Sequence, residues 1–234
     1  MGTFSNKALG LSVDRRDLPV YGVSEAARYL GVPESTMKSW VFGRAYVTVS
    51  GESRTFRPLI EPADPNGQRE LSFFNIVEAH VLLATRKVHG ISLENIRNAI
   101  DYVREQFPAN AIHPLITQEF HTDGKDLFIK SIEETVNASR KGQLAFRELV
   151  NAHLELIDRD VYGMPVKLYP KRGNRAVVIN PSLSSGRPVV RGTGVLASII
   201  AQRVESGERT SEIAQNYGVP ESDIVAAIEY AKAA

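Results

Sequence analysis

The stretch that decides the fold is SEAARYLGVPES at residues 24–35, which recurs as SEIAQNYGVPES at residues 211–222. Eight of the twelve positions are identical. Each copy has a small residue where two short helices would touch, Ala27 or Ala214, and a glycine that tolerates a positive φ at the turn between them. An apolar residue follows each glycine and can fill the gap between the helices. Both copies therefore predict a helix-turn-helix.

The residues that follow the first copy favour contact with DNA. Met37, Trp40 and Val41 form an apolar stripe, which we expect to face inward. The opposite face of the same helix, which could enter a major groove, carries Ser35, Lys38, Ser39 and Phe42. Residues 28–57 carry five basic and two acidic side chains, so this part of the chain attracts phosphate.

The residues that follow the second copy favour contact with protein. Residues 223–230 are acidic and apolar, a composition that phosphate would repel. Residues 198–234 carry three basic and six acidic side chains. We therefore expect the second helix-turn-helix to be structural.

Turn residues and apolar periodicity predict the other elements. Ser24 is the expected N-cap of the first helix, and residues 45–71 read as a hairpin or wing. Two antiparallel helices follow, the second capped by Ser92. Strands are expected at 115–120 and 126–131, a helix at 143–159, short strands after residue 165, and helices at about 196–206, 211–217 and 221–232.

Length and composition bound the organisation of the chain. Its 234 residues, 43% of them hydrophobic, suffice for two modest cores. The expected parts are a leader (1–17), a DNA-binding domain (18–107), a connecting β-hairpin and helix (108–164) and a C-terminal domain (165–234). The chain has no cysteine, no apolar run long enough to span a bilayer and no apolar block of a secretory signal, so we expect a cytoplasmic protein.

Signals of catalysis are missing from the sequence. The histidines lack metal-ligand spacing and read as surface or capped residues: His80, His89, His113, His121 and His153. Residues 186–194 do not form a phosphate-binding glycine loop, and residues 184–186 do not form a nucleophile elbow. We expect no catalytic residue, no metal and no cofactor.

The span from residue 18 to residue 106 resembles the MerR-like winged helix-turn-helix. The resemblance rests on VSEAA at 23–27, the turn at 31–32, the wing, and HGISLENI at 89–96 in the final helix pair. It implies a DNA-binding domain within an α+β, mostly helical fold, and it places four residues at the groove: Ser35, Thr36, Lys38 and Ser39. The basic residues in and beside the wing would contact the DNA backbone: Arg44, Arg54 and Arg57. The chain departs from the family in lacking a long coiled-coil helix and a cysteine-based sensor site.

The C-terminal sequence SGRPVVRGT at 185–193, with residues 212–214 and 226–231, resembles a small bacterial domain of uncharacterised function. That domain is similar to the partner module of PIN-domain ribonuclease toxins. The two resemblances together imply a VapB-type antitoxin of a VapBC pair, which binds double-stranded operator DNA and a PIN-domain toxin and regulates its own operon. The domain's usual Gly-Thr-Arg is here Gly192-Thr193-Gly194, so any role of that arginine is absent or moved.

A basic run at 167–191 contains six basic residues and no acid. Such a run is most often a solvated face. The sharper hypothesis is that its arginines meet acidic groups of a partner, since guanidinium pairs bidentately with carboxylate and a metal-dependent ribonuclease carries carboxylates in its active site. The candidates are Arg172, Arg175, Arg187 and Arg191.

A homodimer is expected, because a single winged helix buries little DNA and the last helix has apolar residues that need cover: Ile224, Val225, Ala227 and Ile228. Two other functions remain open. One is a MerR-type transcription factor that responds to a small molecule bound in region 108–165. The other is an interaction adaptor whose helix-turn-helix motifs do not bind DNA.

Overall fold

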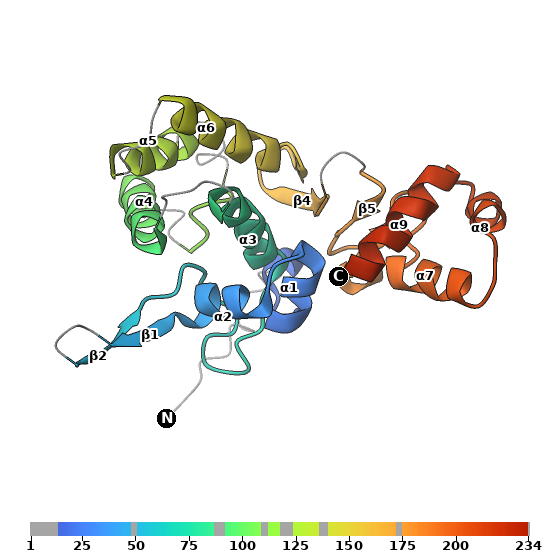
Figure 1. Cartoon of the computed structure of the whole chain (residues 1–234), viewed down its shortest axis with the longest axis horizontal. Coiled ribbons are helices and arrows are strands. Elements are labelled where there is room, and N and C mark those ends of the chain that lie inside the picture. Colours follow the sequence, from blue (N-terminus) through green and yellow to red (C-terminus); the bar gives the residue numbers. More distant parts are fainter. Residues whose placement is uncertain are drawn as a thin grey trace.

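The computed structural model describes residues 14–47, 51–86, 92–108, 112–117, 124–135, 140–171 and 175–233. The described chain is mostly helical, with short antiparallel strand pairs (Figure 1). The predicted α+β, mostly helical class is confirmed. None of the described helices is long and apolar enough to cross a membrane.

The first helix-turn-helix consists of α1 (Val23–Leu30) and α2 (Glu34–Phe42). Gly31 ends α1 in the left-handed region, at φ 63° and ψ 36°, and its N–H bonds back to the helix. Met37, Trp40 and Val41 are buried as predicted. Ser24 is not the N-cap. Helix α1 begins at Val23, its N-cap is Gly22, and no side chain caps it.

The wing is the hairpin of β1 (Arg44–Val47) and β2 (Ser53–Phe56), which projects beside α2 (Figure 1). Residues 48–50 of the predicted wing lie outside the described residues. The return loop leads to α3 (Phe73–Arg86), whose start is closed by a reciprocal pair. The Ser72 Oγ accepts from the Asn75 N–H at 3.2 Å, and the Asn75 Oδ1 accepts from the Ser72 N–H at 3.0 Å.

Helix α3 lies at the centre of the first core and packs against α1 and α6 (Arg140–Leu154). Helix α4 (Leu93–Gln106), capped by Ser92 as predicted, packs against α5 (Lys125–Thr135).

Two element predictions in the connecting region were wrong. Residues 126–131 belong to α5, because the apolar residues Phe128, Ile129 and Ile132 are spaced to meet the core from one helical face. Residues 115–117, the described part of the other expected strand, form a turn. The helix expected at 143–159 ends at Leu154, and its last residues form β3 (Ile157–Arg159), paired with β4 (Pro165–Leu168).

The C-terminal elements have a second core. They comprise β5 (Val177–Val178), β6 (Val189–Val190), α7 (Ala197–Glu205), α8 (Thr210–Tyr217) and α9 (Glu221–Ala233), close to the predicted ranges. Gly218 ends α8 at φ 65° and ψ 33°, nearly the angles of its counterpart Gly31. The repeated sequence therefore makes the same turn twice.

The two helix-turn-helix units meet at α1. The Tyr230 hydroxyl, on α9, donates to the Tyr29 carbonyl at 2.8 Å. The Tyr21 hydroxyl donates to the Gly186 carbonyl at 3.1 Å. Gly186 has a φ of 75°, and a Cβ there would lie 1.9 Å from the Tyr21 oxygen, so only glycine fits this contact.

Candidate nucleic-acid interface

The outer face of α2 carries most of the predicted groove residues. Ser35 and Lys38 are exposed, and Thr36 is half-buried at the first turn. The Lys38 Nζ lies 2.5 Å from a carboxylate oxygen of Glu34, one helical turn earlier. Hydrogen bonds from Lys38 and from Ser24 lower the pKa of Glu34. The free protein thus holds its groove-facing lysine in an exposed ion pair.

Ser39 follows Ser35 by one helical turn, but the residue is only half-exposed. Its hydroxyl oxygen is buried and has no hydrogen-bond partner among the described residues. A buried hydroxyl cannot contact a base unless α2 moves, so the prediction for Ser39 does not fit this structure.

The basic residues of the wing lie at its base and along it. Arg44 is exposed at the start of β1, and Arg54 pairs with Tyr46 across the hairpin, although its side chain lies outside the description. The Arg57 guanidinium is 74% exposed and lies 2.6 Å from the Asp101 carboxylate on α4. The side chains of Arg44 and Arg57 are thus accessible to the phosphates of a DNA backbone.

An aromatic stack attaches the wing to the domain. The rings of Tyr46 and Phe56 stack at 4.2 Å, and the Arg97 guanidinium lies over Phe56, 4.8 Å from the ring centre. The Arg97 Nε also donates to the Arg57 carbonyl at 2.7 Å. Sequence reasoning did not find this role, because Arg97 lies forty residues beyond the wing and has no local signal.

In the second copy, the helix that corresponds to α2 is α9, and its outer surface differs from that of α2. The repeat aligns Lys38 with Val225 and Thr36 with Asp223. Asp223 is buried at 7% exposure and accepts from Arg191 at 3.3 Å, while α9 packs against α7 and α8. The position that presents a cation in the first copy presents a valine in the second.

The residues predicted to form a dimer interface are mostly internal. Ile224 and Ala227 are fully buried in the C-terminal core, and Ile228 packs partly against it. Only Val225 among the four is exposed. The apolar face of α9 is covered by α7, α8 and the β5–β6 pair of the same chain, so it needs no second copy.

The arginines of the basic run differ in their partners. Arg191 is paired with Asp223, and Arg175 lies 3.8 Å from an Asp158 carboxylate oxygen and over the Tyr169 ring. Arg172 lies outside the described residues. Arg187 is exposed, has no acidic partner within the described part of the chain, and borders a cavity of about 250 Å³ between α1 and the C-terminal domain.

Three histidines are not at the surface but are buried with hydrogen-bond partners: His80, His113 and His153. The other two, His89 and His121, lie outside the described residues. The described ranges contain no cluster of three or more histidine, aspartate or glutamate side chains that could hold a metal.

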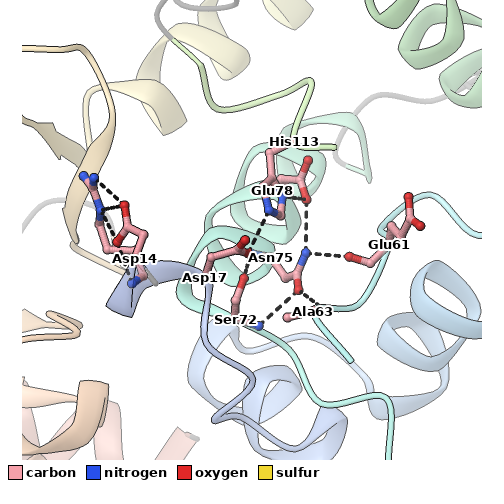
Figure 2. A network of polar contacts seen from close by, with 9 residues as sticks. Asp14, Asp17, Glu61, Ala63, Ser72, Asn75, Glu78 and His113 are labelled. Atoms are coloured by element: carbon pink, nitrogen blue, oxygen red, sulfur yellow. Dashed lines mark hydrogen bonds and ion pairs between the residues drawn. The ribbon is translucent and has the colours of Figure 1, made fainter. Parts of the chain in front are cut away.

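His113 lies between two carboxylates (Figure 2). Its ring nitrogens are each 3.1 Å from an oxygen, Nδ1 from Glu78 and Nε2 from Asp17. Burial alone would lower the pKa of His113, but the hydrogen bonds and charges of Glu78 and Asp17 raise it to about 9. The imidazolium therefore ties the end of the leader to α3.

The chain was compared with known families and proteins. Residues 19–100 match the family described as "Putative DNA-binding HTH domain", and residues 177–231 match DUF433, a protein family of unknown function. The crystal structure of Rv2018 from Mycobacterium tuberculosis has the same fold, with a TM-score of 0.66 at 24% identity, over 93% of this chain and 98% of that chain.

Two proteins of Mycobacterium tuberculosis are similar over most of the sequence. One, named "Uncharacterized protein Rv2308", is 27% identical over 226 residues, which cover 92% of this chain and 91% of the relative. The other, named "Putative antitoxin VapB45", is 29% identical over 221 residues, which cover 88% of this chain and 90% of the relative. The chain is thus a homologue of a protein named as a VapB antitoxin, with a helix-turn-helix segment followed by a DUF433 segment, as the sequence predicted.

Proposed function

We propose that this protein is a non-catalytic, DNA-binding antitoxin. Its first helix-turn-helix binds operator DNA, and its C-terminal part binds and neutralises a PIN-domain ribonuclease toxin, so that the protein regulates its own operon. The proposal is supported by the similarity to the relative named as an antitoxin and by the match of residues 19–100 to a DNA-binding family.

One observation carries the DNA-binding part of the proposal. Two copies of the same motif make the same turn, yet at the matched outer position the first has a cation, Lys38, and the second has Val225. Phosphate attraction and hydrogen bonding to base edges both require such groups. The first copy also has a basic wing beside it, whereas the second is packed among its own helices.

Titration of the full chain with operator and random DNA tests this assignment. Lys38→Ala with Ser35→Ala should cost about 1–3 kcal/mol on the operator and reduce discrimination against random DNA. Arg44→Ala with Arg57→Ala should weaken binding to both DNAs, and each lost phosphate contact should reduce the salt slope by about one unit.

Val225→Ala is the matched control, because Val225 occupies the position of Lys38 in the second copy and is exposed. It should leave DNA affinity unchanged. Loss of binding in this control, with normal binding by the Lys38 variant, would place DNA recognition in the wrong motif.

The toxin-binding part rests on Arg187, an exposed guanidinium without an acidic partner among the described residues. A carboxylate-rich ribonuclease site would supply that partner. Co-purification with a PIN-domain protein encoded beside this chain should be weakened by Arg187→Glu. Arg209→Glu is the control, since Arg209 is exposed directly before α8 and its side chain pairs with Glu212 of the same helix. Equal co-purification of both variants would show that Arg187 is merely solvated.

A further inference from the structure

A cavity of about 350 Å³ lies under the wing. Its walls come from the end of α2, the loop that leaves β2, and α4. Pro58 and Pro65 give it exposed apolar surface, and Val41, Leu59 and Ile100 lie buried in its walls. The volume lies within the range of small-molecule sites, which combine apolar walls with a few polar groups.

The charge around this cavity is positive. Four arginines line it with two acids, and they are Arg57, Arg69, Arg97, Arg104, Glu61 and Asp101. Asp101 contacts two of these arginines, Arg57 at 2.6 Å and Arg104 at 3.1 Å. The other two guanidiniums have no ion pair with a described residue, and that of Arg69 lies over the Phe42 ring.

Arg97 is the group whose state is unexplained by the protein alone. Its side chain is buried, with 7% of the residue exposed. The Nε donates to the Arg57 carbonyl, but neither terminal nitrogen has a hydrogen-bond acceptor among the described residues. Burial and the nearby Arg57 charge lower its pKa, and the charges of Glu94 and Asp101 only partly oppose them. A buried guanidinium whose terminal N–H groups lack acceptors is costly, and an anion would relieve this cost.

We propose that the cavity binds a small molecule with a carboxylate or phosphate group, which Arg97 takes through its two terminal nitrogens. The apolar part of the ligand rests on Pro58 and Pro65. Arg69, at the rim, adds a second cation. A fork of two N–H groups matches the geometry of both oxyanions.

A free small molecule fits better than a phosphate of duplex DNA. The terminal nitrogens of Arg97 have almost no exposed surface, so a backbone phosphate on the outside of a double helix cannot reach them. A small ligand already inside the cavity reaches these nitrogens if the wall moves, and the wall here is the loop from Arg57 to Arg69, which contains no helix or strand.

Calorimetric titration of the full chain without DNA tests the proposal. The probes are benzoate and phenyl phosphate, with benzyl alcohol as their uncharged counterpart. At least one anion should bind saturably, and benzyl alcohol at least tenfold more weakly. Arg97→Gln should weaken anion binding by about tenfold to a hundredfold, the usual cost of a charged hydrogen bond. Arg69→Gln should weaken it by a smaller factor.

Two controls keep the outcome decisive. Arg209→Gln removes an exposed arginine from α8 and should leave the titration unchanged. If Arg97→Gln fails to fold, as judged by circular dichroism, the exposed Arg69→Gln variant replaces it. Weaker anion binding by that variant supports the proposal, and unchanged binding overturns it. The proposal is overturned if neither anion binds at millimolar concentration, if benzyl alcohol binds equally well, or if a folded Arg97→Gln binds the anions normally. It also fails if that variant changes only the salt dependence of DNA binding, which would assign Arg97 to the DNA backbone.

Discussion

The charged state of His113 should make the stability of the protein fall as the solution becomes alkaline. His113 is 9% exposed and bridges Glu78 on α3 to Asp17 in the leader. The free energy of unfolding is measured at rising pH for the native chain and for His113→Gln. The variant keeps a hydrogen-bonding side chain but cannot carry the charge. The quantity of interest is the difference between their free energies of unfolding.

The raised pKa fixes both the sign and the size of the effect. In the folded protein the pKa is about 9, against 6.5 for the ordinary group. The stabilisation is therefore fully present below pH 6.5 and is lost as the pH rises through about 9. A shift of this size corresponds to about 3 kcal/mol in acid, about 2 kcal/mol near neutrality, and almost nothing well above the folded pKa.

Urea unfolding of both chains between neutral pH and about pH 10 measures this difference. Lysines and tyrosines titrate in both chains, so their contributions cancel. The difference should shrink by about 2 kcal/mol across the range. A flat difference would refute the assignment of a charged His113 in the folded state.

Three further outcomes are expected. Glu34→Gln should raise DNA affinity a few-fold in a mobility-shift assay, because it frees Lys38 and removes a negative charge beside the groove; unchanged or weaker binding would contradict this. Gly186→Ala should destabilise the chain by about 2 kcal/mol or more, since its Cβ would overlap the Tyr21 hydroxyl. Gly194→Ala, with a similar φ of 73° and open space, should cost only about 1 kcal/mol. Light scattering without DNA should give about twice the 25.8 kDa of one chain, and a monomer at micromolar concentration would exclude the predicted homodimer.

The elements found from sequence are those whose signals are local. Gly31 and Gly218 both end helices in the left-handed region, and Ser92 caps α4, because each acts on its own chain neighbours. The stripe of Met37 and Trp40 is internal for a similar reason, since helical spacing alone places them on one face.

The features missed by sequence reasoning depend on residues far apart in the chain. Residues 126–131 read as a strand because a short apolar run carries little periodicity, and only packing against α4 and α6 shows that it is helical. His113 meets partners 35 and 96 residues away, and Arg97 meets the wing 40 residues away. Ile224 looked like an exposed interface residue because the helices that cover it were not yet placed.

The second helix-turn-helix serves the first as a structural support. The last carbonyls of a helix have no partner within it, and the Tyr29 carbonyl, in the last turn of α1, receives the hydroxyl of Tyr230 from α9. Tyr21, directly before α1, is bound to Gly186 from the same domain. Helix α1 in turn packs against α2, whereas the wing is held separately through Arg97. The C-terminal domain therefore contacts α1, which in turn packs against α2. These contacts do not involve the wing.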